Sequence, residues 1–169
     1  MNIWVIADTH FNHKNITNLD NRPVDYKEQI VANWSRLVAD TDIVIHLGDV
    51  IFSRQSELEN ILATLPGYKV LTRGNHDHAK DAWYHRAGFS VVTQSYRLGQ
   101  LLFSHEPQCP LREDIRLNLH GHFHNDDHRR EEYEDNEYYL NNQGRYKLVV
   151  PTVEPVLLST LTSVLALLV

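Results

Sequence analysis

YKVLTRGNHD, residues 68–77, joins an apolar run to a cluster of polar side chains. Its first half is rich in strand-forming residues and predicts a β-strand. Its second half, from Gly74 to Asp77, places an asparagine, a histidine and an aspartate directly after that strand. In α/β sheets, ligands bind outside the carboxyl ends of the strands. Asn75, His76 and Asp77 are therefore candidates for a functional site.

Four other predicted strands end in the same kinds of residue. The polar groups that follow them are Asp8-Thr9-His10, Gly48-Asp49, Ser104-His105 and His120-Gly121-His122-Phe123-His124. Residues two apart on an extended chain point the same way, so His122 and His124 can reach one cluster, and so can Asp8 and His10. Imidazoles, carboxylates and one amide oxygen suit borderline divalent metals such as Mn, Fe, Zn or Ni. The pattern predicts a metal site at the edge of a sheet.

The order of the predicted elements indicates an α/β fold. Helices are expected at 24–39, 56–65 and 79–88, with Ser56 as an N-cap and Gly88 closing the third helix. The first half of the chain thus follows a βαβαβα pattern, and the second half is mostly β. This arrangement predicts a parallel-rich sheet joined to a second sheet, with helices outside. The later strands are expected at 90–93, 96–98, 101–104, 115–120 and 146–150.

The composition is that of a globular protein. Of 169 residues, 42% are hydrophobic and 22% are charged, which suits a single domain spanning 1–169. The net charge of -6 argues against nucleic acid as the main partner, because a phosphate backbone favours a basic surface. Cys109 is the one cysteine and cannot form an internal disulfide, so we expect a reducing, cytoplasmic location.

The C-terminal segment 156–169 is the most apolar part of the chain. Its 14 residues fall short of the ~20 that span a bilayer. We expect a buried helix, or a strand followed by a helix, that packs on the core or on a second copy of the chain. A membrane-associated or self-associating tail is the alternative hypothesis.

Taken in order, the motifs D-x-H, G-D, G-N-H-D, H and G-H-x-H resemble those of the calcineurin-like metallophosphoesterase superfamily. The resemblance spans residues 3–124, and the start IADTHFNHKNI looks like a branch of small phosphoesterases without accessory domains. The resemblance implies a four-layer α/β/β/α sandwich and a site for two divalent transition metal ions.

The resemblance assigns the metal ligands, and the chemistry of a two-metal site suggests roles for four neighbouring residues. His76 would donate a proton to the leaving oxygen of the substrate, or stabilise its charge. Asp77 would orient His76 or keep it protonated, although it could instead cap the helix near Ala79. His13 and Arg73 would contact the phosphate. The first metal would take Asp8, His10, Asp49 and His124; the second would take Asp49, Asn75, His105 and His122, with Asp49 bridging.

These roles predict a phosphohydrolase that acts on a small phosphomonoester or phosphodiester, with a nucleotide as one candidate. A nuclease and a non-enzymatic scaffold on the same fold are the alternatives. The chain departs from the motifs G-D-x-x-D-R-G and G-N-H-E of the superfamily's protein Ser/Thr phosphatases, which argues against that activity. Substrate choice should depend on the loops 11–24, 51–55, 106–114 and 125–138, where Arg22 is one candidate contact.

Overall fold

A computed structural model of the chain describes residues 1–19, 22–52, 56–108, 111–123, 146–149 and 155–159. The acidic segment 125–138, Cys109 and His124 therefore lie outside the described residues. In chain order, the elements are β1 Ile3–Ile6, α1 Ile16–Leu19, α2 Tyr26–Leu37, β2 Ile43–His46, α3 Ser56–Thr64, β3 Tyr68–Thr72, α4 Asp81–Arg86, β4 Phe89–Thr93, β5 Ser95–Leu98, β6 Leu101–Ser104, β7 Leu117–His120, β8 Tyr146–Val149 and β9 Val156–Leu157.

The first sheet has the strand order β4-β3-β2-β1-β9. Strands β1 to β4 are parallel, as the βαβαβα pattern predicts. The sequence pattern grouped the segment 90–93 with the later, closely spaced strands, yet β4 forms an edge of this first sheet. Its neighbour β5 starts only two residues later but belongs to the second sheet.

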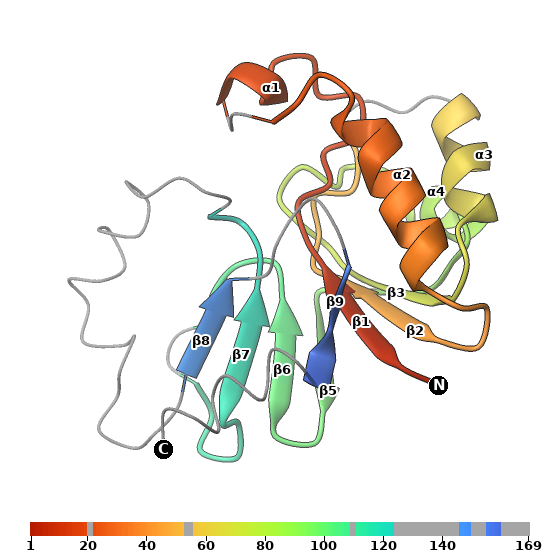
Figure 1. The fold of residues 1–169 in the computed structure, drawn as a ribbon. Coiled ribbons are helices and arrows are strands. Elements are labelled where there is room, and N and C mark those ends of the chain that lie inside the picture. Colours follow the sequence, from red (N-terminus) through yellow and green to blue (C-terminus); the bar gives the residue numbers. More distant parts are fainter. Residues whose placement is uncertain (20–21, 53–55, 109–110, 124–145, 150–154, 160–169) are drawn as a thin grey trace.

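The second sheet has the order β5-β6-β7-β8, with β5 antiparallel to β6 and the other pairs parallel. Its inner face packs against the first sheet (Figure 1). Alternate residues of β1 and β2, such as Val5 and Ile45, meet Phe103 and Leu119 in one buried cluster. This period-two pattern leaves the opposite face of the first sheet available for helices.

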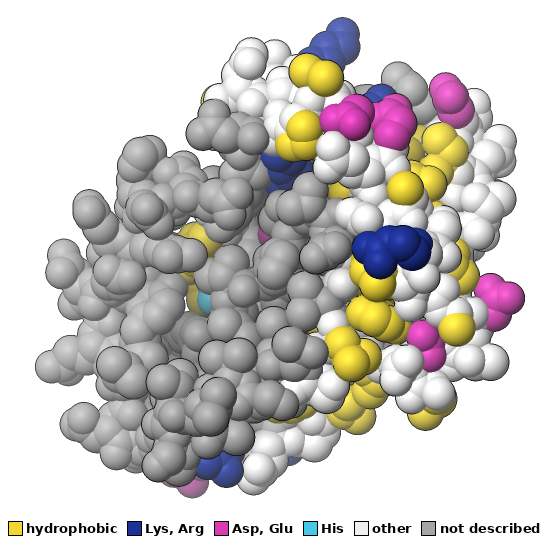
Figure 2. Space-filling model, viewed as in Figure 1, with side chains coloured by type: hydrophobic (Ala, Val, Ile, Leu, Met, Phe, Trp, Pro, Cys, Tyr) yellow, Lys and Arg dark blue, Asp and Glu magenta, His cyan; other side chains and the backbone are white. Residues whose placement is uncertain are grey.

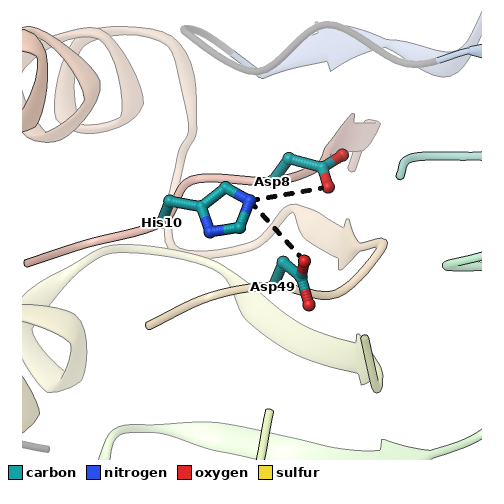
Figure 3. A group of neighbouring side chains, drawn as sticks. All are labelled: Asp8, His10 and Asp49. Carbon is teal, nitrogen blue, oxygen red and sulfur yellow. Dashed lines mark ion pairs between the residues drawn. The ribbon is translucent and has the colours of Figure 1, made fainter. Parts of the chain in front are cut away.

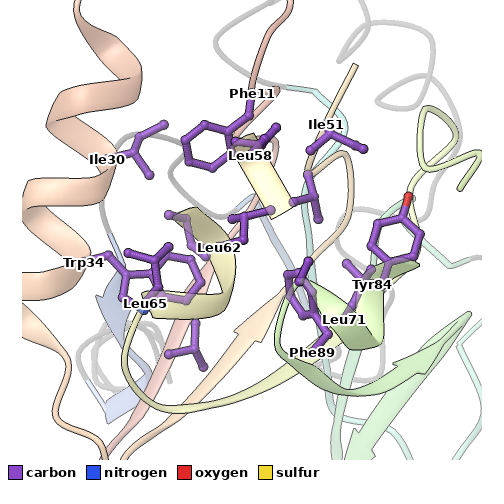
Figure 4. Close-up of a cluster of buried hydrophobic side chains, with 14 of the residues drawn as sticks. Phe11, Ile30, Trp34, Ile51, Leu58, Leu62, Leu65, Leu71, Tyr84 and Phe89 are labelled. Atoms are coloured by element: carbon purple, nitrogen blue, oxygen red, sulfur yellow. The ribbon is translucent and has the colours of Figure 1, made fainter. Parts of the chain in front are cut away.

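Helices α2, α3 and α4 cover that opposite face (Figures 1 and 4). Ile30 and Trp34 lie one turn apart on α2 and are fully buried, together with Leu62 of α3 and Tyr84 of α4. Each large apolar side chain buried in this way contributes about 1.5–3 kcal/mol. Gly88 follows α4 with φ +90°, which confirms the predicted C-terminal stop, whereas α1 was not predicted.

Within the described residues, the layers are therefore helix, sheet and sheet. The fourth, outer helical layer that the resemblance implies is not found among them. The beginning of the apolar tail forms β9, which pairs antiparallel with β1, and Leu158 is buried between the sheets. This agrees with a tail that starts as a strand on the core; residues 160–169 lie outside the described part. Among the residues that the structure describes, no helix has the length and apolar character needed to cross a membrane.

Candidate metal centre

The loops that follow β1 and β2 run side by side at the carboxyl edge of the first sheet. The backbone N–H of Asp8 donates to Gly48 O at 3.0 Å, and that of His10 donates to Asp49 O at 2.9 Å. The parallel ladder of the two strands thus continues into the loops. This pairing places the side chains of Asp8, His10 and Asp49 together.

Asp8, His10 and Asp49 form a buried cluster in which the potential ligand atoms all lie within 4.8 Å of one another. His10 Nε2 is 3.5 Å from Asp49 Oδ2 and 4.0 Å from Asp8 Oδ1 (Figure 3). These are three of the four residues that the sequence assigned to the first metal. The fourth, His124, lies outside the described residues.

A second group of candidate ligands surrounds His105. Its Nε2 atom lies 2.8 Å from Asn75 Oδ1, 3.1 Å from His122 Nδ1 and 3.5 Å from Asp49 Oδ2. These residues come from the ends of β2, β3, β6 and β7, so both sheets contribute. Asp49 Oδ2 is therefore equally far, 3.5 Å, from His10 Nε2 in one group and from His105 Nε2 in the other.

Backbone groups fix the orientation of these side chains. Leu47 O can only accept a hydrogen bond, so His105 Nδ1 at 2.9 Å carries a proton, and Nε2 is the ring atom that could bind a metal. The His76 backbone N–H donates to Asp49 Oδ1 at 2.9 Å, which leaves Oδ2 facing the two imidazoles. Likewise, the backbone N–H of His122 donates to Asp8 at 3.0 Å and ties the two sheets together.

Backbone strain is concentrated at the same residues. Asp8, His10, Asp49 and His122 have φ values of 50°, 47°, 54° and 71°, a region that L-residues with a side chain rarely occupy. Such conformations cost on the order of 1–3 kcal/mol each and gather at functional sites. Four of the predicted metal ligands therefore have an unfavourable backbone conformation, which is typical of a functional site.

Two glycines allow the strands to approach the carboxylates closely. A Cβ atom on Gly74 would overlap Asp49 Oδ1 and lie 2.5 Å from the Asp49 backbone nitrogen. A Cβ atom on Gly121 would overlap Asp8 Oδ2. The glycines that precede Asn75 and His122 are thus required by the carboxylates of the site.

The electrostatics of the site fit a divalent cation. Asp8 and Asp49 are both almost completely buried, and burial raises the pKa of Asp49 above its ordinary value. Two carboxylates withdrawn from water in this way need a compensating charge. A divalent ion held by imidazoles, carboxylates and an amide oxygen would supply that charge, and such a donor set is typical of sites for borderline metals.

The Asp77 carboxylate makes contacts that were not predicted, and its predicted effect on His76 stays a prediction. Its carboxylate accepts hydrogen bonds from the backbone N–H groups of Asp49, Val50 and Gly74 at 2.8–3.0 Å and from the Tyr84 hydroxyl at 3.1 Å. The alternative helix-cap prediction is wrong, because α4 begins at Asp81 and has Lys80 at its N-cap. Asp77 instead joins the two loops that carry Asp49 and Asn75.

Arg73 and His13 occupy different surroundings. The Arg73 guanidinium donates to Asp77 O at 2.7 Å and Ala79 O at 2.9 Å, pairs with Asp81 and lies over the Tyr84 ring. These contacts hold the loop after β3, so a phosphate contact by Arg73 stays a prediction. The His13 ring lies 5.6 Å from that of His10 and is thus brought to the site.

Two residues that support the site were not assigned that role from the sequence. The Tyr26 hydroxyl donates to His10 O at 2.8 Å, and Arg22, considered as a substrate contact, is buried and donates to Thr9 O at 3.2 Å. Both hold the backbone of the first ligand loop, Tyr26 from the start of α2 and Arg22 from the segment that precedes α2. For Tyr26, the sequence signal was a hydroxyl group on the buried, otherwise apolar face of α2, since such a group needs a hydrogen-bond partner.

The fold and the donor set define a metal-binding α/β sandwich with its site at the carboxyl ends of the strands. The family model for calcineurin-like phosphoesterases matches residues 1–161, and the chain belongs to that family. An uncharacterized protein of Methanocaldococcus jannaschii is 34% identical over 128 residues, which cover 72% of this chain and 69% of the relative.

The fold has a counterpart among solved structures. A protein of unknown function from Aquifex aeolicus superposes with a TM-score of 0.69 at 23% identity, and the match covers 96% of this chain and 98% of the other. The fold is thus that of a metallophosphoesterase sandwich, and the buried Asp-His-Asp cluster supports metal-dependent phosphoester hydrolysis as the general chemistry.

Proposed function

We propose that the protein is a phosphohydrolase that uses two divalent transition metal ions to hydrolyse a small phosphoester. The observation that carries the proposal is the position of Asp49 Oδ2, 3.5 Å from both His10 Nε2 and His105 Nε2. A carboxylate oxygen that is equally close to both groups of ligands is suited to bind a metal ion in each group. Asp8, His10 and Asp49 would hold one ion, and Asp49, Asn75, His105 and His122 the other, with His124 as a further candidate for the first.

Bound ions supply Lewis-acid activation of water and of the phosphoryl oxygens. The protein's own residues position the reacting groups around them. His76 is held next to the centre by its backbone bond to Asp49, and its ring lies 5.6 Å from that of His10. Because its side chain is only partly buried, it can reach a substrate and donate a proton to the leaving oxygen.

The described residues on the face shown in Figure 2 give no support to a nucleic-acid substrate. In the view of Figure 2, the lysine and arginine side chains of the described residues stand at separate places and form no continuous stripe. A nucleic-acid backbone would favour such a stripe. A small phosphoester remains the better-supported substrate class.

The proposal is tested with metal-stripped protein to which Mn²⁺ is returned, using p-nitrophenyl phosphate and its bis-phosphodiester analogue. We expect hydrolysis of at least one substrate only after metal is added, and loss of both activity and metal in His105→Gln. His85→Gln is the matched control, because His85 lies on α4 and bonds Phe89 O away from the site. Failure of wild type with every metal tried would instead favour the scaffold hypothesis.

A further inference from the structure

We propose that Phe52 is a stacking platform for the leaving group of the substrate, and that this group carries a planar ring such as a nucleobase. The inference rests on the proposed function, because it takes His76 as the group that protonates the leaving oxygen. It adds the substrate class and a specificity-determining residue that the metal site itself does not require.

Phe52 is fixed directly beside the ligand loops. Its backbone N–H donates to Phe11 O at 3.0 Å, and Phe11 forms a parallel bridge with Ile51. This short ladder extends the pairing that aligns His10 with Asp49. The backbone of Phe52 is thereby held at a set position relative to the candidate metal ligands.

The Phe52 ring contacts two imidazoles of the site. Its centroid is 4.2 Å from the His13 ring and 5.4 Å from the His76 ring. Half of the side chain is nevertheless exposed to solvent. An apolar ring that is anchored on one side and open on the other can bury its open face against a flat ligand.

The flank of the centre at Asn75 and His105 has a different chemistry. A cavity of about 280 Å³ adjoins Asn75 and His105 and is lined mainly by polar side chains, among them Gln94, Ser104 and Gln108. The aromatic flank is the one that contains His76. Because a proton donor must lie next to the leaving oxygen, the leaving group extends on the Phe52 flank rather than into the polar cavity.

The test compares adenosine 5′-monophosphate with ribose 5-phosphate, which share the same leaving oxygen and differ in the presence of the base. Dissociation constants are measured by calorimetry, and KM and kcat are measured with Mn²⁺. We expect the nucleotide to bind about 5- to 150-fold more tightly, the effect expected for one base stacked on an aromatic ring. Phe52→Leu should abolish this ratio, and Phe52→Tyr should retain it.

Tyr68→Leu is the control, because Tyr68 is equally half-exposed but lies at the opposite, amino end of β3. Its affinity ratio should equal that of wild type. Equal affinities for the two ligands in wild type, or an unchanged ratio in Phe52→Leu, would overturn the inference. An equal loss of affinity for both ligands in Phe52→Leu would also overturn it, because Phe52 would then only position His13 and His76.

The two proposals can fail separately. Hydrolysis of p-nitrophenyl phosphate without any base-dependent affinity would leave the phosphohydrolase proposal intact and remove the platform. Base-dependent binding that is lost in Phe52→Leu, without hydrolysis of any phosphoester, would support the platform and refute the proposed activity.

Discussion

Replacing Asp77 with asparagine should destabilise the fold much more than a surface substitution does. The carboxylate is buried and accepts four hydrogen bonds, three of them from backbone N–H groups. In Asp77→Asn, one oxygen can still accept from Asp49 and Gly74, but the amide NH₂ faces the N–H of Val50. Tyr84 can rotate its hydroxyl to accept from that NH₂, whereas the Val50 donor cannot be satisfied in this way.

The expected size follows from these contacts. A buried donor left without an acceptor costs about 1–3 kcal/mol, and the loss of charge weakens the remaining bonds. We therefore expect the free energy of unfolding to fall by about 2–5 kcal/mol. For a domain of this size, this lowers Tm by about 4–20 °C. Burial raises the pKa of Asp77, while its four donors favour the ionised form, so the measurement belongs near neutral pH.

The assay is thermal unfolding of metal-free protein followed by circular dichroism, with Tyr84→Phe as the matched variant. Tyr84→Phe removes one hydrogen-bond donor and leaves the three backbone hydrogen bonds to Asp77, so the free energy of unfolding should fall by about 1.5 kcal/mol. A double-mutant cycle isolates the Asp77–Tyr84 coupling. An unchanged Tm in Asp77→Asn, with activity lost mainly on poor leaving groups, would refute this reasoning and restore Asp77 as the partner of His76.

His76→Asn should keep its metal and lose about 10²–10⁴-fold in kcat on an alkyl phosphoester, but less on p-nitrophenyl phosphate, whose leaving group needs no proton. Steady-state kinetics on both substrates check this, and equal losses would mean that His76 stabilises the phosphoryl group. Gly74→Ala should abolish metal binding, because the added Cβ overlaps the Asp49 carboxylate; calorimetric titration with Mn²⁺ measures it, and unchanged affinity would contradict the geometry. Burial lowers the pKa of His46 from 6.5 to about 3, so the unfolded state binds more protons between these values. The contribution of His46 to the stability of metal-free protein should therefore be constant above about pH 6.5 and fall by up to ~1.4 kcal/mol per pH unit below it. Urea unfolding at several pH values should show a shallower slope for His46→Gln.

Most of the site could be predicted from the sequence because its ligands follow predicted strands. A parallel sheet aligns the carboxyl ends of its strands, so Asp8, Asp49 and Asn75 had to lie along one edge. The approach of the second sheet could not be derived from local pattern. That approach brings His105 and His122 to the same centre, and its contacts join residues more than 50 positions apart.

The contacts of Asp77 and Arg73 could not be predicted from the sequence, because they are tertiary. Asp77 and Arg73 are close in sequence to the predicted ligand Asn75. Asp77 is hydrogen-bonded by the loop after β2 and by Tyr84 of α4, and Arg73 pairs with Asp81, the first residue of α4. Similarly, the alternation that marks β4 as a strand carries no information about which sheet it joins. The half-exposed Phe52 has no sequence signal of its own, since its importance lies in the two imidazoles that it contacts.

The central claim, one carboxylate shared by two ligand groups, is tested most directly by counting metal ions in wild-type protein and in Asp49→Ala. After metal removal and dialysis against Mn²⁺, mass spectrometry of the metal content should give about two ions per chain for wild type, as in other two-metal sites. Asp49→Ala should retain fewer than about one ion per chain and no activity. A single ion in active wild type, or two ions in a fully active Asp49→Ala, would contradict the account.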